Sequence, residues 1–392
     1  MVPTPRFRQL PLVLLALLVF PQSVFALLNI DGTRNQVFVF GELHFGYDSN
    51  IFAENPSVIA EPGGNDDFIT TFVVGTEYKR GAGTLSVNAH AQLAYERYRT
   101  HSDRNAVNPS FRLELGRTTG RLTGTLSLAA TRESRADSAI NLRTSSWSYP
   151  VDLRLRYPVN EKLYLTSDTG YLHRKYEDEV VLKNLSEFSQ AVDFFHVYTS
   201  KLDLLGGYRV RFSETLDGRS TDHNFSVGAT GGLLPKLNGL VRFGYQFRDV
   251  NSTSSNILPG RFSNYSALAQ VNWNATRKFV VVGRLSRDFS TTANSLSVDS
   301  LSGNLHANYI LTRRYQVDGG IGYGRNRFLN EVITTPRPPR RDDFFTWDAG
   351  VTFTWSEKFK ASLTYVHLQN WSTLDLSDFT SNGVSLVLTS RF

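Results

Sequence analysis

Apolar and polar residues alternate along most of the chain, from Val37 to the last residue. The alternating segments are roughly 10 to 14 residues long, and a period of two is typical of β-strands rather than helices. The stretch from Val241 to Arg248 places Val, Phe, Tyr and Phe on one face and Arg, Gly, Gln and Arg on the other. Residues 151–157 and 202–212 follow the same pattern. Each segment is therefore predicted to be a strand with one apolar and one polar face.

The length of these segments separates two classes of all-β protein. Strands of soluble sandwiches average about five or six residues, whereas a tilted strand needs about 9 to 11 residues to cross a bilayer. The connections also alternate between short and long, and this alternation is not expected for the connections of a sandwich. Short turns are expected at 79–83, 118–120, 158–161, 199–201, 235–236, 275–277, 312–314 and 356–358. Long loops are expected at 49–66, 101–107, 133–145, 177–186, 214–221, 250–262, 290–298, 329–342 and 373–380.

Eight turns and nine loops make seventeen connections, which predict eighteen strands. An even number places both ends on one side, as in outer-membrane barrels with short periplasmic turns and long extracellular loops. Closure also satisfies every backbone N–H and C=O group in lipid, which an open sheet cannot do. We therefore expect residues 27–392 to form a single-chain transmembrane antiparallel β-barrel. After residue 26 no apolar run of about 18 residues occurs, which excludes a helical membrane protein.

The first 26 residues have the pattern of a secretory signal peptide. Arg6 and Arg8 precede an apolar core from Leu10 to Phe20, and Ala26 is a small residue suited to cleavage. The predicted compartment is the outer membrane of a Gram-negative bacterium. The chain contains no cysteine, so disulfides and thiolate metal sites are excluded.

The five tryptophans are expected at the two membrane interfaces. Trp347 and Trp355 share one face and are eight residues apart, roughly 26 Å along a strand. At a tilt of about 40° this spacing approaches the distance between the two aromatic girdles of a barrel. Trp147, Trp273 and Trp371 also fall near predicted strand ends. The alternative is that these residues belong to a sandwich core.

The last ten residues resemble the C-terminal signal that the barrel assembly machinery recognises. This strand runs from Gly383 to Phe392, places Leu386 and Leu388 on its apolar face and ends the chain on Phe. An edge strand with free hydrogen-bonding groups can be templated by another sheet.

The predicted first strand ends in Gly46-Tyr47-Asp48-Ser49-Asn50-Ile51-Phe52. This stretch resembles the opening motif of the β-barrel porin family associated with exopolysaccharide and capsule gene clusters. Ser49 stands where that family often has a second acidic residue. The resemblance implies export of a polysaccharide, together with periplasmic and inner-membrane export proteins as partners.

The polar faces are expected to line a lumen. Eighteen strands imply a backbone diameter of roughly 35 Å and a bore of about 15 Å if no loop folds inward. The inward set contains eight arginines, which suit carboxylates, phosphates or sugar hydroxyls and which we assign to the solute path: Arg112, Arg154, Arg156, Arg209, Arg211, Arg242, Arg248 and Arg284. It also contains Glu42, Glu96, Glu114, Asp152, Asp203, Asp288, Asp318 and Asp348, so cross-strand ion pairing is the alternative. Phe38 and Phe40 are candidate platforms for sugar rings; the alternative is that the first strand is shifted by one residue, which would turn both rings outward.

Other candidate chemistry is weak. The eight histidines lack metal-ligand spacing, and we expect no metal or other cofactor. Pairs at 66–67, 222–223 and 342–343 resemble those of outer-membrane proteases. Those enzymes use a narrower barrel that brings the pairs together, whereas here the pairs fall on strands two, ten and sixteen of a wider one. Gly320, Gly322 and Gly324 alternate on a strand and predict a smooth inner face. The basic run at 336–341 is a candidate contact for lipopolysaccharide. Nucleic-acid binding is not expected, because the basic residues face a pore.

Four functions remain open at this point. The first is an outer-membrane channel that exports a polysaccharide. The second is a general or anion-selective diffusion porin. An outer-membrane hydrolase and a plugged structural or adhesive barrel are the third and fourth.

Overall fold

The computed structural model describes residues 28–29, 35–55, 57, 63–81, 83–137, 142–177, 182–255, 257–332, 338–374 and 377–392. The predicted signal peptide, residues 1–26, lies outside these ranges. Nineteen strands and one short 3-10 helix occur in the described residues: β1 (Leu28–Asn29), β2 (Asn35–Asp48), β3 (Asp67–Arg80), β4 (Leu85–Tyr98), η1 (Ser102–Arg104), β5 (Ala106–Arg117), β6 (Thr123–Asp137), β7 (Leu142–Pro158), β8 (Leu163–Tyr176), β9 (Leu185–Val197), β10 (Leu202–Thr215), β11 (Gly218–Leu234), β12 (Leu237–Ser252), β13 (Gly260–Trp273), β14 (Phe279–Thr291), β15 (Ser297–Ile310), β16 (Tyr315–Phe328), β17 (Arg341–Thr354), β18 (Phe359–Ser372) and β19 (Phe379–Arg391). None of the helical structure in these ranges is long and apolar enough to cross a membrane.

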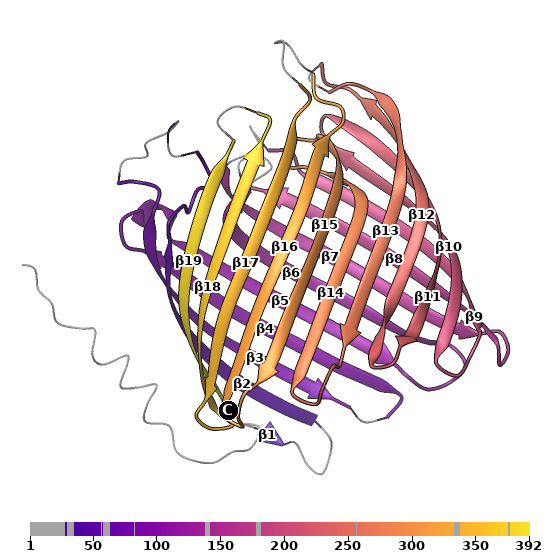
Figure 1. Ribbon diagram of the computed structural model, residues 1–392, viewed down its shortest axis with the longest axis horizontal. Coiled ribbons are helices and arrows are strands. Elements are labelled where there is room, and N and C mark those ends of the chain that lie inside the picture. Colours follow the sequence, from indigo (N-terminus) through magenta and orange to yellow (C-terminus); the bar gives the residue numbers. More distant parts are fainter. Residues whose placement is uncertain are drawn as a thin grey trace, which may run out of the picture.

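Strands β2 to β19 form a closed antiparallel barrel (Figure 1). Each strand pairs with the next along the chain, and β19 returns to pair with β2 from Gly383 opposite Asp48 to Arg391 opposite Phe40. The two-residue β1 pairs only with the start of β2. The C-terminus lies at the end that carries the short turns (Figure 1). The predicted eighteen-stranded barrel is confirmed.

The two faces of the wall have opposite polarity. On β12, the apolar Phe243 is 62% exposed on the outer surface, whereas the polar Gln246 and Arg248 point inward and are 1% and 0% exposed. Apolar side chains are exposed outward on the other strands too, for example Phe194, Leu305 and Leu363. Because lipid is the medium that accepts such a continuous apolar belt, the outer face is the membrane-facing one.

Two predicted long loops are wrong. Most of 133–145 belongs to β6 and β7, and 214–221 is reduced to a turn at 216–217 between β10 and β11. The strands continue beyond the hydrocarbon into the aqueous region, where the outward face need not be apolar. Hydropathy therefore stops alternating there, while backbone pairing continues.

The motif at the end of β2 joins the first and last strands. The Asp48 carboxylate accepts hydrogen bonds from the Asn50 backbone N–H at 2.8 Å and from the Ser381 hydroxyl at 2.7 Å. The Ser49 hydroxyl accepts from the Asn382 N–H at 2.8 Å. At the opposite end of the same seam, Phe392 exchanges both backbone hydrogen bonds with Val39. The motif thus has a structural role in closing the barrel.

One strand pair is incomplete. Strands β13 and β14 pair only from Ala267 opposite Arg287 to Trp273 opposite Val281, which is the half near the short turns. Residues 260–266 of β13 and 288–291 of β14, all described, make no ladder pairs with each other. The upper parts of these two strands therefore separate in the half of the barrel near the long loops.

Candidate functional site in the barrel lumen

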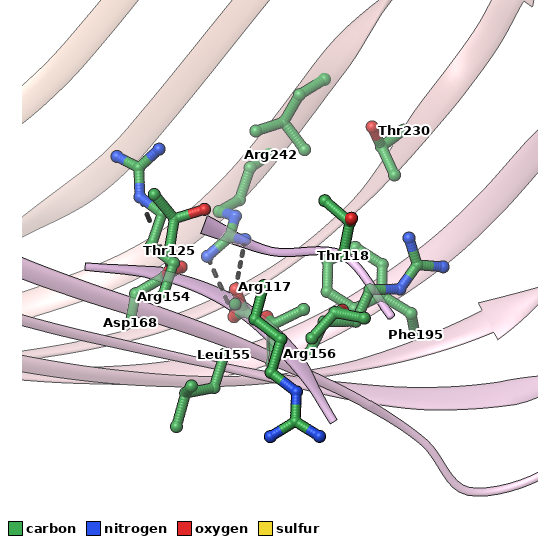
Figure 2. Close-up of a pocket in the computed structure, with 15 residues that line it drawn as sticks. Arg117, Thr118, Thr125, Arg154, Leu155, Arg156, Asp168, Phe195, Thr230 and Arg242 are labelled. Carbon is green, nitrogen blue, oxygen red and sulfur yellow. Dashed lines mark hydrogen bonds and ion pairs between the residues drawn. The ribbon is translucent and has the colours of Figure 1, made fainter. Parts of the chain in front are cut away.

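A cavity of about 540 Å³ lies inside the barrel near the short turns. Strands β5 to β9, β11 and β12 contribute to its wall. Four arginines and two aspartates stand among its lining residues (Figure 2), namely Arg117, Arg154, Arg156, Arg242, Asp168 and Asp193. Arg154, Arg156 and Arg242 thus line the cavity, and their assignment to a solute path stays a prediction.

The arginines of the cavity differ in how firmly they are paired. Arg242 donates two hydrogen bonds to Asp193, at 3.1 and 2.7 Å. Arg154 lies 3.8 Å from Asp168, and its side chain is 76% exposed to the lumen (Figure 2). A long contact at high exposure contributes little energy, so the Arg154 guanidinium can exchange Asp168 for an anionic solute.

A buried pair of aromatic rings adjoins these arginines. The Tyr164 and Phe195 rings stack with centroids 4.5 Å apart and an interplanar angle of 7°. The Arg156 guanidinium lies over the Tyr164 ring at 3.9 Å, and the Tyr164 hydroxyl donates to Asp203 at 2.7 Å. Apolar Leu205 completes the buried cluster. The sequence patterns did not reveal this aromatic pair. The adjacent Phe194 and Phe195 were the available signal, because neighbouring residues of β9 must place one ring on each face of the strand.

In the other half of the lumen, three of the predicted path arginines are committed to aspartates. Arg211 donates to Asp222 at 2.7 Å, and Arg248 donates to both Asp222 oxygens at 2.5 and 2.7 Å. Arg209 donates to Asp288 at 2.8 and 2.7 Å. Arg211 and Arg248 are buried, so they are not accessible to a solute in this conformation. In this structure these three arginines therefore follow the alternative of ion pairing between strands.

The hairpin of β14 and β15 is what buries them. Arg248 donates to the Ser290 carbonyl at 2.7 Å, and Arg211 donates to the Phe289 carbonyl. Both carbonyls lie on β14, whose upper part is unpaired with β13. At the hairpin tip, the Ala293 carbonyl accepts from the Lys183 N–H at 2.8 Å, and Ala293 packs with Leu182 and Tyr176. The hairpin therefore reaches across the lumen to the loop between β8 and β9.

The first long loop also packs at the mouth. Ile51 and Phe52 are buried against Tyr98, and the Arg143 guanidinium donates to the Ile51 carbonyl at 3.1 Å. The first loop therefore folds inward, whereas the expected bore was that of a barrel in which no loop folds inward. They depend on side chains from β4 and β7, which the local pattern of the loop does not reveal.

Other expected site residues lie as follows. Arg112 is on the polar face of β5 and Arg284 on that of β14. Phe38 and Phe40 share the inward face of β2 with Glu42, and the Phe40 ring stacks on His90 at 5.2 Å. Trp147, Trp347 and Trp371 are in the half of the wall near the long loops, whereas Trp273 ends β13 and Trp355 follows β17 at the short-turn end. The girdle and the assembly signal at Gly383, Leu386, Leu388 and Phe392 remain predictions.

The rim pairs that resembled protease residues make structural contacts. Asp67 accepts from the backbone N–H groups of Arg99, Thr100 and His101. Asp222 faces inward, while the adjacent His223 stacks on Phe247 on the other face of the sheet. In the basic run, Arg340 pairs with Asp342 and Arg341 with Asp343, whereas 336–337 lie outside the described residues.

The inner face at Gly320, Gly322 and Gly324 is not bare. An added Cβ at these positions would meet Asp348, Thr346 and the Phe344 ring at 2.5, 2.5 and 2.0 Å. Side chains of β17 therefore lie over the glycines of β16, which corrects the expected smooth surface.

Three residues with metal-ligand chemistry meet beside Gly320. His306, Asp318 and Asp348 each offer an atom within 4.8 Å of the other two. Cross-strand register brings them together, since His306 and Asp348 both lie opposite Gly320, and sequence spacing gave no signal of this. A divalent ion could use these atoms. Ion pairs of His306 with the two aspartates, at 3.9 and 3.6 Å, also account for the cluster.

A closed antiparallel barrel with an apolar outer belt and a polar lumen defines a channel protein of the bacterial outer membrane. Residues 206–392, from within β10 to the end of the chain, match the family described as "Putative beta-barrel porin 2". This match confirms the predicted resemblance to a β-barrel porin family.

Solved structures with similar folds have low sequence identity to this chain. OpdK from Pseudomonas aeruginosa, solved with vanillate, is 10% identical over 91% of this chain and 98% of its own, with a TM-score of 0.47. OccAB4 from Acinetobacter baumannii is 10% identical over 93% and 100%, with a TM-score of 0.47. The siderophore receptor PirA from P. aeruginosa is 10% identical over 90% and 80%, with a TM-score of 0.42. No curated protein sequence matches the chain.

Proposed function

We propose that this barrel exports an acidic polysaccharide across the outer membrane. The observation that carries the proposal is the turn-side cavity, whose lining contains Arg117, Arg154, Arg156 and Arg242. Arginine supplies forked donors for the carboxylate or phosphate groups of an acidic sugar chain. Because the turns are periplasmic in barrels of this type, the cavity is placed where a polymer made in the cell would enter.

Weak and repeated contacts suit a chain that must slide. Arg154 is only loosely paired with Asp168, and Arg242 is held by Asp193, so the wall offers both free and balanced charges. Such contacts replace part of the hydration of the polymer without trapping it. The resemblance of residues 46–52 to a family associated with polysaccharide gene clusters supports the same role. It implies periplasmic and inner-membrane export proteins as partners.

Loss of the polysaccharide at the cell surface tests this function. A strain that lacks the protein is expected to retain its acidic polymer inside the envelope, and wild-type protein to restore surface display. Arg154→Gln with Arg156→Gln should restore it only partly. Arg135→Gln is the matched control, because Arg135 is an exposed arginine at the other end of the barrel wall, paired with Glu133 at 3.3 Å. Normal surface polymer in the deletion strain would overturn the proposal.

An anion-selective diffusion porin is the second candidate. The exposed Arg154 would attract small anions as well as a polymer. In that case the deletion strain keeps its surface polysaccharide but takes up small anionic solutes more slowly.

A further inference from the structure

The partial separation of β13 and β14 leaves hydrogen-bonding groups without a ladder partner in the upper half of the wall. Unpaired backbone groups are costly in lipid, so barrels normally pair them along the whole strand. Here the Phe289 carbonyl of β14, which points to the β13 side, receives a guanidinium donor from Arg211 instead. Arg248 donates to the neighbouring Ser290 carbonyl, which points to the β15 side because consecutive carbonyls of a strand alternate. Arg211 therefore stands in for one bond of the missing β13 ladder, and Arg248 adds a second bond that holds the hairpin inward.

The upper hairpin lies inside the barrel rather than in its wall. Asn264 has the inward parity of β13, and its side-chain amide donates to Asp299 of β15 at 2.5 Å. Phe289 shares its face of β14 with Leu285, which is exposed outward, yet Phe289 itself is 2% exposed. The face of the hairpin that would look at lipid is thus turned against the inner wall.

The segment nevertheless keeps the alternation of a strand. Phe289 shares one face of β14 with Leu285 and Arg287, and Arg287 pairs with Asp299 of β15 at 2.8 Å, while Asp288 and Ser290 lie on the other face. Continuing the observed β13–β14 register upward from Ala267 opposite Arg287 would place Tyr265 opposite Phe289. Tyr265 is 71% exposed on the outer face, so the two aromatic rings would then lie side by side on that face, next to the Arg287–Asp299 pair.

We propose that the β14–β15 hairpin is a gate with two states, the observed closed state and an open state in which β14 completes its pairing with β13. Opening breaks the Arg211 and Arg248 bonds to β14 and forms ladder bonds between β14 and β13, and the tip at Ala293 leaves the loop that carries Leu182. The barrel wall is then complete, and the hairpin no longer occupies the lumen.

We call the residues that hold the hairpin in place the latch, namely Arg209, Arg211, Arg248, Asp222 and Asp288. Their charges suggest what favours opening, and this step rests on the proposed function. In the closed state Arg209, Arg211 and Arg248 are used by Asp222, Asp288 and the β14 carbonyls. Release of the hairpin removes Asp288 from this cluster, while Asp222 stays on wall strand β11 with Arg211 and Arg248, so the charge of Arg209 becomes available in the lumen. An acidic polymer thus binds the open state better than the closed one, which is the differential affinity that a population shift requires.

Disulfide locks test the gate directly, because the chain has no cysteine of its own. Tyr265→Cys with Phe289→Cys should form a disulfide only if the open pairing occurs. Leu182→Cys with Ala293→Cys should lock the closed state. Ala267→Cys with Arg287→Cys is the positive control, since these residues are already opposite each other. Each full-length barrel is purified in detergent and recorded in planar bilayers with potassium chloride, before and after reductant.

The open lock is expected to raise the unitary conductance above that of the wild type, and the closed lock to lower it, with reductant reversing both. If the control pair cross-links but the Tyr265 and Phe289 pair does not, the gate is overturned. Equal conductance of both locks would also overturn it. The recordings contain no polysaccharide, so their outcome is independent of the surface-display test of the proposed function.

Discussion

At the residue scale, the same amino acid has different roles according to its neighbours. Arg154 and Arg248 both lie on the polar face of a strand, as the alternation predicts. Arg154 is exposed and loosely paired, whereas Arg248 is buried between Asp222 and a β14 carbonyl. Sequence parity assigns the face of each arginine. It does not predict the hydrogen-bond partner of each arginine, because Arg248 and Ser290 lie on different strands and meet only in the folded barrel.

The exposed arginines should determine ion selectivity. Arg154→Gln with Arg156→Gln removes two positive charges, each worth up to about 1 kcal/mol to an anion at roughly 4 Å in water. The anion-over-cation permeability ratio is therefore expected to fall severalfold, measured as the reversal potential in a salt gradient. Arg209→Gln should change it much less, because Asp288 already balances that charge. An unchanged reversal potential in the double variant would show that these arginines do not set selectivity.

The buried carboxylate of the latch should be important for stability. Asp222→Asn leaves Arg211 and Arg248 with one fewer buried counter-charge. Removal of one partner of a buried pair costs about 3–5 kcal/mol, so the urea midpoint of the refolded barrel should fall. Asp103→Asn, at an exposed position in η1, should leave the midpoint unchanged. Equal midpoints for the two variants would contradict the latch.

At the element scale, strand number and facing could be predicted, but strand ends could not. Eighteen strands follow from counting turns and loops, and the apolar parity of β10, β12 and β19 is as predicted. The loop expected at 214–221 is instead strand and a two-residue turn. Hydropathy alternates only where one face meets lipid, so it reports the membrane-spanning part of each strand and not its extension into water.

The closing seam between β2 and β19 should depend on Asp48. Asp48→Ala removes the acceptor for Asn50 and Ser381, each bond contributing about 0.5–1.5 kcal/mol and more when a charged group takes part. We expect a lower temperature for the loss of the compact band in heat-modifiability gels. Asp103→Ala, at an exposed position in η1, serves as the control. A compact band that persists equally in both would contradict a seam role for the motif.

At the scale of the whole molecule, the sequence predicts a barrel but not how far its lumen is open. The bore estimate assumed that no segment folds inward, and both the first loop and the β14–β15 hairpin do so. Their contacts join strands that are far apart in the chain, such as Arg211 on β10 and Phe289 on β14. Local alternation of apolar and polar residues does not predict such contacts, because the sequence around Phe289 fits a strand in the wall as well as a hairpin inside the lumen.

The lumen is proposed to conduct an acidic sugar chain through its arginine-lined entrance near the short turns. Single-channel recording with a linear polyuronate oligosaccharide added on the turn side tests it most directly, with a neutral dextran of equal length as the comparison. We expect voltage-dependent current blocks by the polyuronate, rare blocks by dextran, and loss of the difference in the Arg154→Gln, Arg156→Gln barrel. Equal blocking by both sugars in the wild-type barrel would contradict the account.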